Sequence, residues 1–162
     1  MRKAVLVDRD DTLCRDIPYC DDPDRIKAYP GVPEAVRRLN DAGYLVLMVT
    51  NQSGIGRGYF TVETLEKVND SLRAQIAECG GRIDDIFFCP HRPEDNCECR
   101  KPKIGMGLQA ISKYDLDPSK CWMVGDKEKD IDFGKALGMR SILVSESFTF
   151  VDAVSQILDS DP

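Results

Sequence analysis

The sequence lacks several features that define whole classes of protein. Among its 162 residues, no apolar run approaches the roughly 20 residues that a membrane-spanning helix needs. The apolar run nearest the N-terminus has only four residues before Asp8, which is too short for the core of a signal peptide. These absences argue against a membrane protein and a secreted one, and we expect a soluble protein of the cytoplasm.

Basic residues are also in short supply. Lys and Arg total 22 against 28 Asp and Glu, which gives a formal net charge of −6. This excess of negative charge argues against sequence-independent binding to nucleic acid or to an anionic membrane surface. Any anionic substrate must therefore be bound at a local cluster of positive charge, and we expect neither a nucleic-acid partner nor a membrane partner.

Histidine is scarcer still, with one residue, and the cysteines number seven. An odd count is typical of a reducing compartment, where cysteines are core residues, nucleophiles or metal ligands more often than disulfide partners. The chain has no internal repeat and no shift of composition that would mark a domain boundary. With 42% hydrophobic residues it is long enough for one core and cramped for two, so we expect one domain over residues 1–162 and a monomer.

What the sequence does contain is a regular alternation of short apolar runs and helical patterns. The apolar runs predict buried strands over residues 3–7, 44–49, 85–88, 121–124 and 141–144. Apolar spacing and end signals predict helices over residues 33–42, 62–79, 106–114, 128–137 and 151–158. This alternation predicts a doubly wound α/β fold with a mostly parallel sheet, in which ligands bind at the carboxyl ends of the strands.

Two long loops remain, residues 14–29 and residues 90–103. Neither is long enough to form a separate cap domain, although both can overhang the crevice at the strand ends. Without a cap, these two loops must shape the substrate pocket.

Charged and polar side chains follow the predicted strands. Asp8 and Asp10 follow the first strand, Thr50 the second and Asp126 the fourth. Converging carboxylates are the hard oxygen ligands that Mg²⁺ prefers, and Lys101 with the Thr50 hydroxyl can stabilise a phosphoryl group. Two carboxylates two residues apart can divide the work of nucleophile and general acid/base. The pattern predicts Mg²⁺-dependent phosphoryl transfer, although one acidic pair alone is often only a solvated loop or a helix cap.

A second group of metal-binding residue types lies in the loop after the third strand. Cys89, His91, Cys97 and Cys99 form the pattern C-x-H-x₅-C-x-C. Three thiolates and one imidazole suit tetrahedral Zn²⁺, and four protein ligands leave no open coordination position, so we expect a structural zinc site. Zinc there would also fix Lys101, two residues after Cys99. The alternative is that these cysteines are core residues and His91 a surface histidine.

Taken together, the motifs resemble the haloacid dehalogenase superfamily of phosphatases. That family has Asp-x-Asp after the first strand, Ser or Thr after the second, Lys before Pro, and Gly-Asp-x-x-x-Asp after the fourth, and all four motifs occur here in order. The resemblance implies that Asp8 is the nucleophile, Asp10 the general acid/base, Thr50 the phosphate-binding hydroxyl and Lys101 the stabilising cation. It also implies that Mg²⁺ is held by Asp8, Asp10 and Asp126.

Two positions beside these motifs are open to more than one interpretation. Asp130, which ends the Gly-Asp-x-x-x-Asp motif, is either a metal ligand or a cap of the helix that begins there. Asp11 stands where the family usually has Gly directly after the second Asp. If this position needs a positive φ, Asp adopts it more readily than most residues but at some cost, and a third carboxylate could weaken phosphate binding.

The cysteine and histidine loop narrows the resemblance to the group that contains the D-glycero-D-manno-heptose-1,7-bisphosphate 7-phosphatases and the histidinol-phosphate phosphatases. The segments 50–58, 99–102 and 124–127 are closer to the heptose enzymes, which implies a sugar bisphosphate as substrate. The substrate-binding residues expected on this basis are Asp16, Tyr19, Asn51, Gln52, Ser53, Arg57, Arg100 and Lys127. The alternatives are a histidinol-phosphate phosphatase, whose substrate's ammonium would suit the acidic first loop, and a protein that binds phosphate ligands without turnover.

Overall fold

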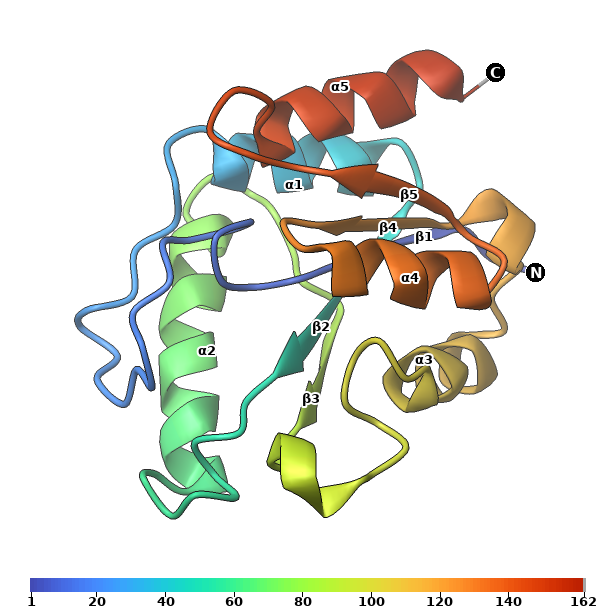
Figure 1. Ribbon diagram of the computed structural model, residues 1–162. Helices are drawn as coiled ribbons and strands as arrows, with labels where there is room; N and C mark the ends of the chain where they lie inside the picture. Colours follow the sequence, from blue (N-terminus) through green and yellow to red (C-terminus); the bar gives the residue numbers. More distant parts are fainter. Residues whose placement is uncertain (162) are drawn as a thin grey trace.

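A computed structural model describes residues 1–161 of the protein. At its centre lies one sheet of five parallel strands in the order β3-β2-β1-β4-β5 (Figure 1). The strands are β1 (Ala4–Val7), β2 (Leu45–Asn51), β3 (Asp85–Cys89), β4 (Trp122–Gly125) and β5 (Arg140–Leu143). This order confirms the doubly wound α/β prediction, because the chain starts in the middle of the sheet and adds strands to one side and then to the other.

In the described residues, helices cover both faces of the sheet (Figure 1). They are α1 (Val32–Asp41), α2 (Val62–Ala77), α3 (Gly105–Tyr114), α4 (Glu128–Ala136) and α5 (Phe150–Ser160), with short 3-10 turns at Pro93–Asp95 and Pro118–Lys120. Helices α1, α2 and α5 share one hydrophobic core with one face of the sheet, and α3 and α4 share a second core with the other face. The sheet is therefore the middle of three layers.

Alternate residues of the central strand β1 point to the two faces, as the pleat of a strand requires. Val5 and Val7 belong to the core with α1, α2 and α5, whereas Ala4 and Leu6 belong to the core with α3 and α4. All four side chains are fully buried. Burial on both faces is the reason why β1, β2 and β4 are continuous apolar runs in the sequence, whereas the edge strands β3 and β5 are only partly buried.

The boundaries of the elements agree with the sequence predictions to within two residues, and the difference at the end of β2 affects two residues of the site. Thr61 caps α2 as expected, since its side-chain oxygen accepts a hydrogen bond from Thr64 N at 3.2 Å. Strand β2, however, extends to Asn51, so Thr50 and Asn51 belong to the strand and not to the loop after it. Pairing of Asn51 with Cys89 of β3 holds this end of β2 in the ladder.

The first loop (residues 14–29) lies on α2 and is tied to it by side chains of the helix. Gln75 accepts a hydrogen bond from Ala28 N at 2.8 Å and donates one to Ile26 O at 2.8 Å. Ser71 Oγ donates to Pro23 O at 2.8 Å. These bonds fix the base of the loop while its tip extends over the carboxyl ends of the strands. None of the described helices is both long and apolar enough to cross a membrane.

Candidate active site

Three carboxylates meet where β1 and β4 end. Asp8 directly follows β1, Asp126 directly follows β4, and Asp130 lies in the first turn of α4. Each offers an oxygen within 4.8 Å of the other two, and we call this group the carboxylate cluster. Asp126 Oδ1 is buried and has no hydrogen-bond partner within residues 1–161. A buried carboxylate oxygen without a partner is unfavourable, and a bound cation would provide that partner. This cluster therefore has oxygen ligands that could hold a metal ion.

Lys101 joins two of these carboxylates. Its Nζ donates to Asp8 Oδ1, Asp130 Oδ1 and Val49 O, each at 2.8 Å, and only 1% of its side chain is exposed. Burial works to lower the pKa of Lys101, but the charges of Asp8 and Asp130 outweigh it and raise the pKa above its usual value. Burial also raises the pKa of Asp8, against the lowering effect of Lys101. A charged lysine therefore holds the predicted nucleophile in place.

Both oxygens of Asp130 are used within the protein. Oδ1 accepts the bond from Lys101, and Oδ2 accepts a hydrogen bond from Lys127 N at 3.1 Å, which closes a capping box at the start of α4. The approach of Asp130 to β4 requires a glycine, because a Cβ at Gly125 would collide with the Asp130 side chain. Of its two interpretations, the structure favours a cap that also orients Lys101.

The Asp10 carboxylate lies outside the carboxylate cluster and has side-chain partners of its own. Arg9 Nε donates to its Oδ1 at 2.9 Å and Gln52 Nε2 to its Oδ2 at 3.4 Å. Arg9 is itself buried and also donates to Asn69 Oδ1 at 2.9 Å on α2. The Asp10 carboxylate is not part of the group formed by Asp8, Asp126 and Asp130, and the Mg²⁺ role predicted for Asp10 stays a prediction. The carboxylate lies in a position suited to acid/base work.

The end of β2 supplies three polar side chains with different partners. Gln52 Nε2 donates to Thr50 Oγ1 at 2.9 Å, so the Thr50 hydroxyl hydrogen stays available for a ligand. Asn51 Oδ1 accepts from Lys101 N at 3.0 Å, and its Nδ2 donates to Lys101 O at 3.2 Å. Both ends of the Asn51 amide are engaged by the Lys101 backbone, so Asn51 positions Lys101. The substrate contact predicted for Asn51 stays a prediction.

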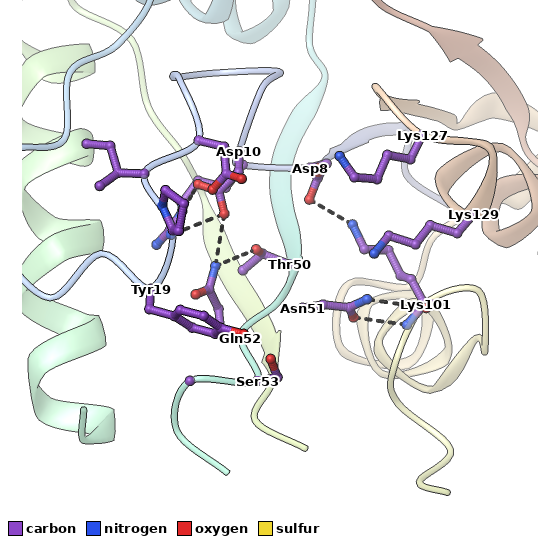
Figure 2. A pocket seen from close by; sticks show the side chains of 15 residues that line it. Asp8, Asp10, Tyr19, Thr50, Asn51, Gln52, Ser53, Lys101, Lys127 and Lys129 are labelled. Carbon is purple, nitrogen blue, oxygen red and sulfur yellow. Dashed lines mark hydrogen bonds and ion pairs between the residues drawn. The ribbon is translucent and has the colours of Figure 1, made fainter. Parts of the chain in front are cut away.

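These side chains line a cavity of about 290 Å³ between the first loop and the strand ends (Figure 2). The lining includes four of the predicted catalytic residues, Asp8, Asp10, Thr50 and Lys101. The remaining lining residues are Arg9, Asp16, Ile17, Pro18, Tyr19, Asn51, Gln52, Ser53, Gly54, Lys127 and Lys129. The first loop thus overhangs the site, as expected. Arg57 and Arg100 are not among the lining residues, and Arg57 Nε is bonded to Ser53 Oγ at 3.4 Å.

Asp11 adopts the left-handed conformation, with φ of 60°, so the position does need the positive φ that the family's glycine provides. Its carboxylate points to the first loop, where Oδ1 accepts hydrogen bonds from Asp16 N at 2.9 Å and from Tyr29 OH at 3.4 Å. Asp11 is not part of the carboxylate cluster. The bonds it makes to the loop are therefore a gain that a glycine could not provide.

The predicted Cys/His cluster forms as expected in space. Cys99 Sγ lies 2.9 Å from Cys89 Sγ and 3.2 Å from His91 Nδ1, and Cys97 Sγ lies 3.5 Å from Cys89 Sγ. Atoms bonded to one tetrahedral ion at about 2.3 Å lie roughly 3.8 Å apart, so the side chains are already gathered within the space that one ion would need. Burial works to raise the pKa of Cys97, but neighbouring backbone N–H groups and thiols lower it to about 7. The four side chains could therefore hold a metal ion.

This cluster is connected to the loop after β2 by backbone hydrogen bonds. Gln52 N donates to Cys89 O at 2.8 Å, and Gly56 N donates to Pro90 O at 2.9 Å. A Cβ at Gly56 would lie 2.6 Å from Pro90 O, so the close approach of the two loops depends on glycine. An ion at the Cys/His cluster would thus fix both Lys101 and the loop after β2.

Known proteins with similar sequences show which family the chain belongs to. A family described as HAD-hydrolase-like matches residues 98–159. D-glycero-beta-D-manno-heptose-1,7-bisphosphate 7-phosphatase of Haemophilus influenzae is 42% identical over 140 residues, which is 83% of this chain and 76% of that protein. A probable D-glycero-D-manno-heptose-1,7-bisphosphate 7-phosphatase of Thermoplasma volcanium is 39% identical over 136 residues, 83% of this chain and 93% of that protein. The chain belongs to the heptose-bisphosphate phosphatase family of the haloacid dehalogenase superfamily.

Solved structures place it in the same family. The D,D-heptose 1,7-bisphosphate phosphatase from B. bronchiseptica, complexed with magnesium and phosphate, has a TM-score of 0.90 at 32% identity and covers 99% of this chain and 100% of its own. The corresponding enzyme from Burkholderia thailandensis has a TM-score of 0.67 at 35% identity, over 99% of this chain and 88% of its own. As a heptose-bisphosphate phosphatase relative, the protein is a phosphomonoesterase, and the fold and enzyme class expected from the sequence are confirmed.

The structure adds two residues that the sequence did not single out. Arg9, between the two motif carboxylates, is a buried partner of Asp10, and Lys129 lines the cavity beside Lys127. Local pattern gave no signal for Arg9, because its second partner, Asn69, lies 60 residues away. For Lys129 the signal was its place inside the Gly-Asp-x-x-x-Asp motif, where an extra cation follows Lys127.

Proposed function

We propose that this heptose-bisphosphate phosphatase relative removes the 7-phosphate from D-glycero-D-manno-heptose 1,7-bisphosphate through an aspartyl-phosphate on Asp8. The observation that carries the mechanism is that Lys101 donates to Asp8 at 2.8 Å in a cavity that Asp10 and Thr50 also line. Identities of about 40% to proteins named for this activity support the substrate.

The residues divide the two chemical steps. In the first, an oxygen of Asp8 attacks phosphorus while the bond from phosphorus to the sugar oxygen breaks, and protonated Asp10 gives that oxygen its proton. In the second, the Asp10 carboxylate takes a proton from water, whose oxygen attacks phosphorus, so that inorganic phosphate leaves and Asp8 is regenerated. Throughout, Lys101 and the Thr50 hydroxyl stabilise charge on the phosphoryl oxygens.

Two metal ions belong to this proposal. The hard oxygens of Asp8 and Asp126 suit Mg²⁺, which when bound offsets the repulsion between an anionic nucleophile and an anionic substrate. The buried, unpartnered Asp126 Oδ1 supports a cation there. Cys89, His91, Cys97 and Cys99 suit Zn²⁺, in a structural role because four protein ligands fill a tetrahedral ion.

The charges of the pocket favour a bisphosphate over histidinol phosphate. Lys127 and Lys129 line the wall of the cavity, and a bisphosphate has a second anionic group for them to bind. The acidic residues that would suit the ammonium of histidinol phosphate, Asp21, Asp22 and Asp24, are not among the lining residues. Asp16 alone brings a first-loop carboxylate into the cavity, which keeps histidinol phosphate as the second candidate.

The test measures phosphate release from heptose 1,7-bisphosphate and from histidinol phosphate side by side, with and without Mg²⁺. We expect Mg²⁺-dependent turnover that prefers the bisphosphate, and loss of turnover in Asp8→Asn. Asp21→Asn, which removes an exposed first-loop carboxylate, is the matched control and should retain activity. Turnover in Asp8→Asn would contradict the proposed mechanism. Preference for histidinol phosphate would contradict the proposed substrate. Absence of hydrolysis with either ester would favour a protein that binds phosphate ligands without turnover.

We also propose that the enzyme acts in the cytoplasm as a monomer of one domain. In residues 1–161 none of the seven cysteines forms a disulfide, which suits a reducing compartment. Two of the exposed large hydrophobic residues, Tyr19 and Tyr59, pack edge to face at 4.9 Å and so cover each other in part. Light scattering on the purified protein would measure its mass, and a dimer mass would contradict the proposal.

A further inference from the structure

Lys129 lies in the first turn of α4, three residues after Asp126, and lines the active-site cavity. Its side chain is half-buried. Figure 2 shows the ends of Lys127 and Lys129 directed toward the side of the cavity where Asp8 and Lys101 lie. The sequence motifs assign no role to this lysine. The chemical steps proposed above do not use it, and only its place in the cavity lining, beside Lys127, was used above to favour a bisphosphate.

The cations that line the cavity differ in one respect. Arg9 is paired with Asp10 at 2.9 Å, Lys101 with Asp8 at 2.8 Å, and Lys127 with Asp126 at 3.0 Å. Lys129 has no ion pair and no hydrogen-bonded side-chain partner within residues 1–161. In the described part of the chain, Lys129 is therefore the one cation lining this cavity that is not paired with a carboxylate.

The surroundings of Lys129 are unfavourable for an ammonium group without an ion-pair partner. Lys129 is half-buried, and the charges near it include those of Arg100 and Lys101 as well as the carboxylates of Asp130 and Asp8. A cation in the first turn of a helix is also repelled by the positive end of the helix dipole. Removing charge from water without a partner is unfavourable, and an anion in the cavity would supply that partner.

We infer that Lys129 is a phosphate-binding residue of this pocket, whose ammonium donates to an oxygen of a phosphate group of the substrate and of the product. The inference rests on the proposed phosphatase function and adds a binding residue to it. The partner is either the transferred phosphoryl group, on the side of Lys101, or the second phosphate of a bisphosphate, on the side of Arg100. Both are phosphate dianions, and they can be separated by choice of substrate.

The experiment compares Lys129→Gln, Lys129→Arg and Lys135→Gln. Lys135 lies in the last turn of the same helix and is exposed, so its replacement removes the same charge away from the cavity. Three quantities are measured with Mg²⁺ present: inhibition by inorganic phosphate, KM for p-nitrophenyl phosphate, and KM for heptose 1,7-bisphosphate. Melting temperatures show whether each variant is folded.

We expect Lys129→Gln to weaken phosphate binding by about 10- to 100-fold, the usual effect of losing a hydrogen bond to a charged group, and Lys129→Arg to restore most of it. If the transferred phosphoryl group is the partner, inhibition by phosphate and both KM values change. If the second phosphate is the partner, only KM for the bisphosphate changes.

Equal behaviour of folded Lys129→Gln and Lys135→Gln in all three measurements would overturn the inference. Failure of the proposed substrate would look different, because wild-type enzyme would then cleave p-nitrophenyl phosphate but not the bisphosphate. Inhibition by inorganic phosphate would in that case still test Lys129.

Discussion

The side chain of Asn51 is hydrogen-bonded to the backbone of Lys101 on both sides of its amide, at 3.0 Å from Oδ1 to Lys101 N and at 3.2 Å from Nδ2 to Lys101 O. Asn51 is the last residue of β2, and Lys101 follows the Cys/His cluster, 50 residues later. Through this pair of bonds, the sheet sets the position of the lysine that contacts Asp8.

Replacing Asn51 should therefore impair catalysis through Lys101. We expect Asn51→Ala to lower kcat by about 10- to 100-fold with a smaller change in KM, from the loss of two hydrogen bonds worth about 1 kcal/mol each. Asn40 provides a matched control, because its amide bonds the Arg82 backbone in the same way, at 2.8 and 3.1 Å, away from the cavity. Equal loss of kcat in Asn40→Ala would show a general effect on stability instead.

Asp11 should act on the first loop and not on the metal. Its Oδ1 accepts the bonds from Asp16 N and Tyr29 OH, and an amide oxygen can accept the same bonds. We expect Asp11→Asn to keep near-normal KM, and Asp11→Gly to raise KM by roughly 2- to 10-fold, the usual effect of one or two exposed hydrogen bonds. An increase in Mg²⁺ affinity in both variants, with unchanged KM, would mean that the charge of Asp11 acts on the metal.

Loss of the ion at the Cys/His cluster should reduce activity, although the carboxylate cluster stays in place. We expect Cys97→Ala to bind no zinc, measured by elemental analysis, and to lose most of its kcat, because Cys99 then no longer fixes Lys101. Cys79→Ala, which removes a partly exposed thiol outside the cluster, should keep both zinc and activity. Full activity in a zinc-free Cys97→Ala enzyme would contradict this prediction, because activity would then not depend on the ion at the Cys/His cluster.

Asp85 should make stability depend on pH in acid. Burial works to raise its pKa, but hydrogen bonds from Lys113 and Tyr114, both at 2.6 Å, lower it below 3.8. A pKa that is lower in the folded protein means that this stabilisation is complete above the unfolded pKa and is lost as pH falls through the folded pKa.

Urea unfolding between pH 2.5 and 7 measures this effect. The free-energy difference between wild type and Asp85→Asn should be constant above about pH 5 and should shrink below about pH 4. Loss of metal ligands in acid affects both proteins equally and cancels in the difference. Asp132→Asn, which removes an exposed carboxylate of α4, should show no such change, and a difference independent of pH would contradict the prediction.

The sequence alone predicted the sheet and the motif residues at its edge, because strands buried on both faces must be apolar and parallel strands end at one edge. The positions of Asp8, Thr50, Lys101 and Asp126 at or beyond the carboxyl ends of successive strands were therefore enough to bring these residues to one site. The Cys/His cluster was equally accessible, since its four side chains lie within residues 89–99 and such local spacing fixes what can meet at one ion.

Only the tertiary structure decided which partner each polar side chain takes. Arg9 meets Asn69 across 60 residues, Asn51 meets Lys101 across 50, and Asp130 meets Lys101 across 29. Spacing along the chain does not specify such pairs, because they depend on how β2, α2 and α4 pack around β1. The sequence thus determined the fold, the chemistry and the ligand types, whereas packing determined that Asn51 positions a lysine, that Asp130 caps a helix, and that Lys129 lines the cavity.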